Sequence, residues 1–464
     1  MHFCTNMAAN PMKLFGTDGI RGTANVFPIT PEVALRAGKA IAAVMSEQGE
    51  TRRRVIIGKD TRVSGYMLET ALTSGLVSAG MDVLLVGPLP TPAVAHLTQS
   101  MRCAAGIMLT ASHNPHEDNG LKIFGADGYK LSDHLEERVE HWILSPETPP
   151  LPFDASHIGK ATRIDDARGR YIEFAKHTAE NIALHGLKIV IDCGHGASYM
   201  VAPLIFRELG AEVITMGTAP DGKNINAGCG ALYPEAAGAL VREHGADLGV
   251  SFDGDADRAI FTDAHGQTVS GDRIIALCAL ALKCRNQLRG DAIAVTVMSN
   301  LGLHAAMRDA GIAVISTGVG DRQVIEALRA KDHSFGGENS GHLIFADHAT
   351  TGDGILSALQ VLRVMKESGK PLHELAECMM EYPQQLNSLA VPAKPSLASL
   401  KEFSALLAEA DAALGKNGRQ LIRYSGTENK VRVMVEHPDA TVVQSWTERL
   451  SDALLDAITK HSSP

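Results

Sequence analysis

The chain has 464 residues, of which 45% are hydrophobic and 21% charged, and its formal net charge is −10. This length is too great for a single core and predicts three or four domains of ordinary size. The acidic balance argues against nucleic acid as a main partner, because no long basic run offsets it. An acidic protein that binds an anion must therefore gather arginine, lysine and backbone N–H groups locally.

The cysteines and the apolar runs indicate a cytoplasmic protein without a membrane partner. The seven cysteines are scattered and form no CxxC pair, which is typical of reduced thiols and not of a disulfide framework or a zinc site. No run reaches the roughly 18 apolar residues of a membrane span. The N-terminal residues lack the features of a signal peptide. Either Met1 or Met12 can be the natural start.

The first candidate site loop comprises residues 15–22 (FGTDGIRG). Its glycines let the backbone approach a ligand closely, and Arg21 is suited to bind an oxyanion. Taken alone, this pattern is a weak signal.

A β-branched apolar run, a helix-length segment ending in glycine and a second apolar run recur three times along the chain. Such runs predict strands buried on both faces and joined by helices, with each glycine ending its helix in a left-handed conformation. The unequal spacing favours three related α/β domains over a solenoid. The paired runs are 55–58 and 83–87, 189–192 and 213–217, and 293–297 and 313–318.

Residues 110–115 (TASHNP) follow the apolar run 106–109, which predicts a short buried strand. Asn-Pro favours a turn, because proline moves the preceding residue out of the helical region. Ser112 is therefore expected at the exit of a strand, where its side chain can be presented. Considered alone, a turn serine more often hydrogen-bonds to the local backbone.

The strongest chemical signal is the alternation of Asp253, Asp255 and Asp257 after the apolar run 248–252. Carboxylates at this spacing share one side of an extended chain, and they repel one another unless a hard cation such as Mg²⁺ neutralises them. A calcium EF-hand needs glycine and glutamate where this chain has Arg258 and Ala264, so that interpretation fails. A solvated acidic turn is the alternative.

Two further loops carry polar or glycine-rich patterns. Residues 336–342 (GGENSGH) combine a carboxylate, an amide, a hydroxyl and an imidazole, which suits the hydroxyl or amino groups of a sugar. On this loop alone, a polar turn is an equally good interpretation. Residues 194–196 (GHG) begin like a dinucleotide fingerprint, but Tyr199 stands where glycine is required, so no Rossmann cofactor site is expected.

Proline-rich segments at 145–152 and 382–395 mark a linker and the start of a distinct tail. The tail is expected to form strand 420–424, a loop, strand 431–435 and a helix with one apolar face. Its Ser-Gly-Thr loop between Arg423 and Arg432 is typical of a phosphate cradle. We therefore predict three related mixed α/β domains plus a C-terminal α+β domain, with bounds 1–165, 166–267, 268–382 and 383–464.

Five motifs in this order, FGTDGIRG, TASHNP, DGDADR, GENSGH and RYSGTENKVRV, resemble the α-D-phosphohexomutase family over essentially the whole chain from Met12. The resemblance implies four domains around a central cleft, each delivering a motif loop. It also implies a mutase that interconverts a sugar 6-phosphate and 1-phosphate through a 1,6-bisphosphate. Asn339 and residues 351–354 (TGDG) favour glucosamine, with glucose or mannose as the alternative sugar. More distant alternatives are a magnesium-dependent sugar phosphatase and a non-catalytic phosphosugar sensor.

The resemblance also implies roles for particular residues. Ser112 is the phosphoserine, and one of its oxygens joins Asp253, Asp255 and Asp257 in binding one Mg²⁺. The transfer point is lined by Arg21, His113, Lys122 and Arg258, with His113 and Lys122 as alternatives for the general base. The sugar contacts are Asp321, Arg322, Glu338, Asn339, Ser340 and His342. The phosphate clamp is Arg423, Ser425, Gly426, Thr427 and Arg432. The implied partners are a phosphosugar and an activating sugar 1,6-bisphosphate; a homodimer is left open.

Overall fold

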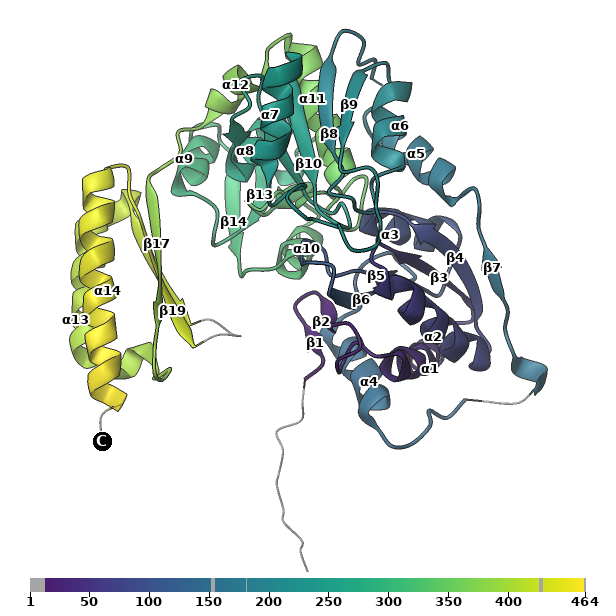
Figure 1. Ribbon diagram of the computed structural model, residues 1–464. Helices are drawn as coiled ribbons and strands as arrows, with labels where there is room; N and C mark the ends of the chain where they lie inside the picture. Colours follow the sequence, from purple (N-terminus) through teal and green to yellow (C-terminus); the bar gives the residue numbers. More distant parts are fainter. Residues whose placement is uncertain (1–12, 152–154, 181, 425–428, 463–464) are drawn as a thin grey trace, which may run out of the picture. The chain divides into compact units, whose positions relative to one another are not determined.

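The computed structural model describes residues 13–151, 155–180, 182–424 and 429–462 (Figure 1). The chain divides into two compact units: unit 1 comprises Met1–Met298 and Ala313–Ala376, and unit 2 comprises Ser299–Ile312 and Glu377–Pro464. Within the described part of the chain, no helix has both the length and the apolar character needed to cross a bilayer.

The first sheet of unit 1 contains β1 (Phe15–Gly16), β2 (Gly19–Thr23), β3 (Arg54–Lys59), β4 (Asp82–Pro88), β5 (Ala105–Leu109), β6 (Asp118–Gly125) and β7 (Ala161–Arg163). Their order is β1-β2-β6-β5-β3-β4-β7. Its helices are α1 (Pro31–Glu47), α2 (Ser64–Ser78), α3 (Thr91–Ser100) and α4 (Asp133–Leu144). The first repeat is confirmed, since β3 and β4 are parallel and Gly80 after α2 has a φ of 82°. The glycine-rich segment 15–22 is an antiparallel hairpin and not an open loop, because Gly19 makes the turn with a φ of 79°.

The second sheet follows the same plan in the order β12-β11-β10-β8-β9. Its strands are β8 (Lys188–Asp192), β9 (Glu212–Met216), β10 (Leu248–Phe252), β11 (Ala259–Thr262) and β12 (Thr268–Val269), and its helices are α5 (Ala167–Thr178), α6 (Val201–Glu208) and α7 (Pro234–His244). β8 and β9 are parallel, which confirms the second repeat. The boundary expected at 267 falls before β12, because this strand pairs with β11 of the second sheet.

The third sheet has the order β14-β13-β15-β16. It contains β13 (Ala292–Thr296), β14 (Ala313–Thr317), β15 (Phe335–Gly337) and β16 (Leu343–Phe345), with α8 (Gly271–Cys284), α10 (Asp321–Ala330), α11 (Gly354–Ser368) and α12 (Leu372–Leu375). The parallel pairing of β13 with β14 confirms the third repeat. The helix between these strands, α9 (Leu301–Asp309), is grouped with unit 2.

Unit 2 is built on a small antiparallel sheet in the order β17-β19-β18, with α13 (Lys401–Leu414) and α14 (Ala440–Ser462) side by side on one face (Figure 1). β18 (Arg419–Tyr424), β19 (Lys430–Glu436) and α14 confirm the expected strands and last helix. β17 (Gln384–Ala390) lies where only a proline-rich separation was expected, because the prolines flank the strand and do not interrupt it.

Residues 299–312 join unit 2 through specific hydrogen bonds. Asn300 Nδ2 donates to Tyr382 O at 3.0 Å, and Tyr382 N donates back to Asn300 Oδ1 at 2.9 Å. Leu301 N, at the start of α9, donates to the buried carboxylate of Glu436. These contacts attach α9 to the C-terminal sheet.

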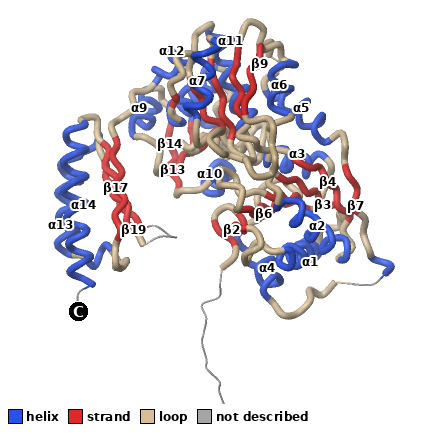
Figure 2. Tube along the Cα trace, viewed as in Figure 1, coloured by secondary structure: helices blue, strands red, loops and turns tan. Residues whose placement is uncertain are grey.

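Three sheets with helices and one smaller α+β sheet confirm the predicted fold class. In unit 1, β5, β10 and β15 each lead into one of the motif loops. The carboxyl ends of neighbouring parallel strands meet at one edge of a sheet, which is where α/β proteins bind ligands. Several loops of unit 1 gather in one region, where the chain is drawn in tan in Figure 2.

Candidate functional site

Ser112 stands at the exit of β5, as the Asn-Pro turn predicts, and its backbone is left-handed with a φ of 54°. A residue with a Cβ rarely adopts this conformation without help from its surroundings. The side chain is buried, and its Oγ donates to Asp253 Oδ2 at 2.6 Å. His113 Nδ1 lies 3.3 Å from the same hydroxyl. Ser112 therefore faces the acidic loop and not solvent.

The three aspartates after β10 converge on one point. Each offers a carboxylate oxygen within 4.8 Å of the other two, and all three residues are buried. Two glycines let this loop pack closely. A Cβ on Gly254 would lie 2.5 Å from Ser112 O, and a Cβ on Gly196 would lie 2.4 Å from Gly254 O. The GHG segment therefore serves as a close backbone contact.

Lys122 of β6 partly neutralises this cluster. Its Nζ lies 2.8 Å from Asp255 Oδ2, 3.0 Å from Asp257 Oδ2 and 3.2 Å from Asp18 Oδ2. Burial disfavours the ammonium, but these carboxylates outweigh it and raise the pKa of Lys122 well above its usual value. Burial raises the pKa of Asp253 well above its usual value, and the neighbouring aspartates add to this shift. One lysine is thus insufficient to satisfy three carboxylates.

The acidic cluster fits a divalent cation. Asp255 Oδ1 is buried and receives no hydrogen bond from the described residues, and Asp257 Oδ1 is approached by His342 Nδ1 at 3.6 Å and Arg258 Nε at 3.8 Å, beyond hydrogen-bond distance. Buried oxygens without donors carry a substantial desolvation cost unless something else binds them. An all-oxygen donor set suits a hard cation such as Mg²⁺. Asp253, Asp255 and Asp257 are therefore the residues that could hold one.

A ring of alternating charges, which we name the charge ring, extends from this cluster. It consists of Asp257, Lys122, Asp18, Lys130, Asp321 and His342. Lys130 Nζ lies 2.7 Å from Asp321 Oδ2 and also pairs with Asp18. His342 closes the ring, 3.7 Å from Asp321 and 3.6 Å from Asp257. The structure thus engages Asp321 and His342, both expected at the sugar, in ion pairs with protein groups.

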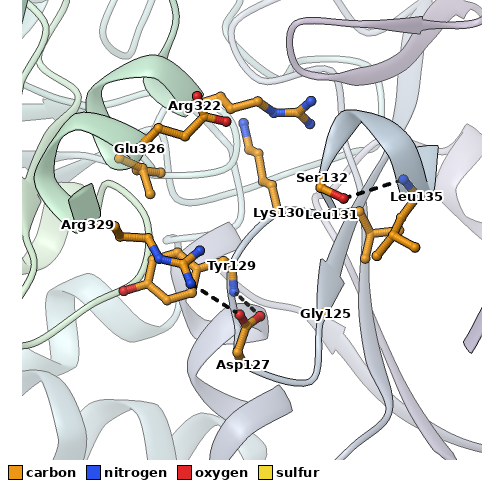
Figure 3. Close-up of a pocket in the computed structure, with 11 residues that line it drawn as sticks. Gly125, Asp127, Tyr129, Lys130, Leu131, Ser132, Leu135, Arg322, Glu326 and Arg329 are labelled. Atoms are coloured by element: carbon orange, nitrogen blue, oxygen red, sulfur yellow. Dashed lines mark hydrogen bonds and ion pairs between the residues drawn. The ribbon is translucent and has the colours of Figure 1, made fainter. Parts of the chain in front are cut away.

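Arg322 contacts two carboxylates of α4. It pairs with Asp133 and lies 2.6 Å from Glu136 Oε1. It also lines a pocket of about 240 Å³ between α10 and the segment after β6, where Figure 3 shows the guanidinium of Arg329 beside the Tyr129 ring. The three cations of this pocket, Lys130, Arg322 and Arg329, each have a carboxylate partner, so the pocket offers no surplus positive charge.

The polar side chains of the loop between β15 and β16 differ in burial and in hydrogen-bond partners. Glu338 is half-buried, and its carboxylate accepts hydrogen bonds from Gly320 N at 3.1 Å and Ser340 Oγ at 3.4 Å. Asn339 is exposed and donates to Met298 O at 3.4 Å. Glu338 and Ser340 thus form a joined polar pair, while the Asn339 amide bonds to a backbone carbonyl.

Two arginines and an imidazole surround the Ser112 hydroxyl region. Arg258 Nη1 lies 3.3 Å from His113 Nδ1, and Arg21 pairs with Asp18. Burial, together with the nearby positive charges of Arg258 and Arg21, lowers the pKa of His113 to about 4. The imidazole is therefore neutral at pH 7, whereas Lys122 retains its proton.

Part of the phosphate clamp expected in the tail falls outside the described residues. Ser425, Gly426 and Thr427 are outside the described residues. Arg423 and Arg432 are directly opposed on β18 and β19. Like charges in a cross-strand pair repel, so this arrangement favours an anion between them.

Two residues that the sequence analysis did not single out contact the Ser112 loop. Arg62, which follows β3, is fully buried and donates to the Ser112 and Asn114 carbonyls. Asn226, from the loop after β9, donates to the same two carbonyls. Because β3 is the parallel neighbour of β5, the residues after these two strands lie at the same edge of the sheet. The strand order could therefore have predicted that Arg62 lies near Ser112.

Known protein families match the chain in four consecutive parts. The models are those for phosphoglucomutase/phosphomannomutase: alpha/beta/alpha domains I, II and III match residues 12–149, 169–266 and 270–382, and the C-terminal domain matches residues 386–453. The chain belongs to the α-D-phosphohexomutase family. This confirms the resemblance of the five motifs. As a phosphohexomutase, the chain is an enzyme of the isomerase class.

Individual relatives of this phosphohexomutase match nearly full length. The phosphoglucosamine mutase of Pelobacter propionicus is 50% identical, covering 97% of this chain and 98% of the relative. That of Geotalea daltonii is 51% identical, covering 95% and 97%. A phosphoglucomutase/phosphomannomutase family protein from Burkholderia thailandensis has a solved structure with a TM-score of 0.80 at 26% identity, covering 96% and 97%. The fold is shared with Aspergillus fumigatus N-acetylphosphoglucosamine mutase, solved with GlcNAc-6P and magnesium (TM-score 0.66, 17% identity, 96% of each chain).

Proposed function

We propose that this phosphohexomutase interconverts glucosamine 6-phosphate and glucosamine 1-phosphate, with Ser112 as the carrier of the transferred phosphate. The observation that carries the proposal is the Ser112 hydroxyl, held 2.6 Å from Asp253 beside a cluster of three buried carboxylates. The choice of glucosamine is supported by relatives named phosphoglucosamine mutase at about half identity over nearly the whole chain. Asn339 is exposed, and a side-chain amide can hydrogen-bond to either an amino or a hydroxyl group.

The proposed cycle begins with phosphorylated Ser112. The O1 hydroxyl of glucosamine 6-phosphate attacks phosphorus, so that the P–O1 bond forms and the bond to Ser112 Oγ breaks, while the O1 proton passes through a base to the departing Oγ. The glucosamine 1,6-bisphosphate then turns over in the site. Ser112 Oγ attacks the 6-phosphate, the bond from phosphorus to O6 breaks, and the serine proton passes to the departing O6. The products are glucosamine 1-phosphate and phosphorylated Ser112.

The side chains support this chemistry by position and charge. Phosphoryl transfer asks little of protein groups beyond orientation and charge stabilisation. When bound to the three aspartates and an oxygen of Ser112, Mg²⁺ would neutralise charge on the phosphoryl oxygens. Arg21, Lys122 and Arg258 supply fixed positive charge at the same place. The neutral imidazole of His113 favours it over Lys122 as the proton acceptor, since only a neutral group can take a proton.

The substrate is proposed to be held by two other regions. Glu338, Asn339 and Ser340 would bind the sugar directly, with Asp321, Arg322 and His342 fixing the surrounding loops. Arg423, Ser425, Gly426, Thr427 and Arg432 would bind the phosphate that is not reacting. A sugar 1,6-bisphosphate would prime Ser112, and the protein would act in the cytoplasm, where phosphosugars occur.

The direct test supplies the full-length protein with glucosamine 6-phosphate, Mg²⁺ and a trace of glucose 1,6-bisphosphate, and follows both phosphosugars by ³¹P NMR. Formation of glucosamine 1-phosphate is expected. Release of free phosphate without glucosamine 1-phosphate would favour a phosphatase. Parallel reactions with glucose and mannose 6-phosphates rank the sugars, and a higher catalytic efficiency on either would overturn the choice of glucosamine.

A serine variant tests the carrier. Ser112→Ala is expected to lose turnover by at least about a thousandfold, because no hydroxyl remains to carry phosphate, while unfolding is little changed. Ser78→Ala, which removes a hydroxyl bonded within α2, is the control and should retain activity. Wild-type turnover by the Ser112 variant would refute the proposed cycle.

A further inference from the structure

The conformation of the Ser112 loop needs an external support. Ser112 has a φ of 54°, although it has a Cβ. In the turn that follows, the carbonyl oxygens of Ser112, Asn114 and Pro115 face the protein interior. Buried carbonyls must receive hydrogen bonds to be retained. The donors that reach them therefore determine where the Ser112 hydroxyl lies.

Arg62 satisfies most of these carbonyls from one side. Its Nη2 donates to Ser112 O at 2.9 Å and Asn114 O at 2.7 Å, and its Nη1 donates to Pro115 O and to Asp118 O at 3.0 Å. An arginine presents its donors in one rigid plane, so a single side chain can fix several acceptors at once. No part of this side chain is exposed.

The guanidinium is itself held in place. Asp60 Oδ2 accepts from Arg62 Nε at 2.8 Å and from Thr110 Oγ1 at 2.7 Å. Thr110 Oγ1 in turn accepts from Ser112 N at 2.9 Å. The backbone C=O and N–H of Ser112 are thus both linked by hydrogen bonds to the buried Asp60 carboxylate, the C=O through Arg62 and the N–H through Thr110.

Asn226 supports the same carbonyls from the second sheet. Its Nδ2 donates to Ser112 O at 3.0 Å and to Asn114 O at 3.1 Å. Gly254 of the acidic loop lies against this contact, since a Cβ there would meet Asn226 Nδ2 at 3.0 Å and Ser112 O at 2.5 Å. The amide therefore connects the Ser112 loop to the part of the chain that carries the three aspartates.

We infer that Arg62 and Asn226 are positioning residues that form a two-sided carbonyl clamp on the Ser112 loop and thereby keep Ser112 Oγ in line for transfer. The inference rests on the proposed function, in which Ser112 both gives and takes a phosphoryl group each cycle. A nucleophile that must return to one position twice per turnover gains from a fixed backbone. A displacement of about 1 Å at a reacting atom can lower a rate by about a hundredfold.

The test measures how quickly Ser112 acquires a phosphoryl group. Dephosphorylated full-length protein is mixed with glucose 1,6-bisphosphate and Mg²⁺, and the phosphoryl adduct is followed by quenched-flow intact mass spectrometry. In this step Ser112 Oγ bonds to phosphorus, the phosphorus–sugar oxygen bond breaks, and the departing oxygen receives the serine proton. Loading of the wild type tests the proposed function, and the difference between variants tests the clamp.

Asn226→Ala is compared with Asn224→Ala, two variants in one loop. Asn224 also donates from its amide to a backbone carbonyl, that of Ala219 at 3.0 Å, and its hydrogen bonds in the described part of the chain stay within residues 219–227. For Asn226→Ala we expect the maximal loading rate to fall about tenfold, with the half-saturating bisphosphate concentration changed by less than about twofold. Asn224→Ala should load as the wild type does. A general disturbance of this loop would lower the loading rate of both asparagine variants alike.

Arg62→Lys completes the test because it keeps the charge and loses the planar donors. Its loading rate should fall about a hundredfold. If this variant does not fold, the Asn226 pair still decides. Equal loading of wild type and Asn226→Ala, or equal slowing of both asparagine variants, would overturn the clamp and leave the proposed function standing. A wild type that never loads would overturn both.

Discussion

The pair of Lys130 and Asp321 allows the stability of the charge ring to be measured. The two side chains are only 7% and 10% exposed, and their atoms lie 2.7 Å apart. Removing one partner of a buried ion pair costs about 3–5 kcal/mol, because the other charge is left unpaired. In Lys130→Met, the Asp321 carboxylate keeps the Arg322 backbone N–H at 2.8 Å, but among the described residues its remaining charged partner is His342 at 3.7 Å, so we expect a loss of about 3 kcal/mol.

The converse substitution should cost less. In Asp321→Asn, Lys130 still pairs with Asp18, so we expect a loss of about 1 kcal/mol. In the double variant neither charge is left without its partner, and its loss should fall short of the sum of the single losses by about 1–2 kcal/mol.

The assay is urea-induced unfolding of all four proteins, followed by tryptophan fluorescence and circular dichroism at pH 7.5. Lys160→Met, an exposed lysine of the same sheet's last connection, is the control and should change stability by less than about 0.5 kcal/mol. Additive losses, with a coupling below about 0.5 kcal/mol, would refute the view that these residues act as a pair.

Three further perturbations concern the carboxylates and the close glycine contact. Burial raises the pKa of Asp353 to about 6, so the native state holds this proton more tightly than the unfolded chain does. About 3 kcal/mol of stability that is present below pH 4 is therefore lost as the pH rises through 6. Asp353→Asn should remove this pH dependence of the free energy of unfolding in urea between pH 4 and 7. Asp255→Asn should weaken Mn²⁺ binding at least about tenfold by calorimetry, because it removes a charged oxygen from the cluster. Gly254→Ala should lower kcat at least about tenfold in the mutase assay, because its Cβ would lie 2.5 Å from Ser112 O.

For each of these three variants, one result would contradict the prediction. An unchanged pH profile in Asp353→Asn would mean that the carboxyl is not the group that titrates; Tyr171→Phe, which removes its hydroxyl donor, should move the transition to higher pH. Wild-type Mn²⁺ affinity in Asp255→Asn would remove this residue from the cation site. For the glycine, Gly169→Ala is the control, since a Cβ there meets nothing within 4 Å.

The local elements were within reach of sequence reasoning, and the long-range pairs were not. Continuous Val and Ile runs with a glycine after each helix identified the parallel strand pairs, because that pattern reports burial on both faces. The alternation of Asp253, Asp255 and Asp257 reported a shared side of one extended chain. β17 was missed because its alternation of polar and small residues, QQLNSLA, has too little apolar contrast for an edge strand to stand out.

The clamp and the charge ring depend on neighbours that are distant in sequence. Lys130 and Asp321 form an ion pair only when two sheets pack together within one unit. Their spacing along the chain therefore does not predict this pair. Asn226 binds backbone carbonyls, which every residue has, so its partner leaves no trace in residue types. Arg62 was the accessible exception, since it follows a strand parallel to the one before Ser112.

The grouping of α9 with unit 2 affects how this enzyme can be dissected. The chain passes between the units after Met298, Ile312 and Ala376, so a single cleavage after Ala376 does not free a complete C-terminal module. It would leave Asn300 without Tyr382 and the start of α9 without the Glu436 carboxylate. A chimera that exchanges the C-terminal region between related enzymes must therefore carry residues 299–312 along with residues 377–464, as one inherited module in two pieces of sequence.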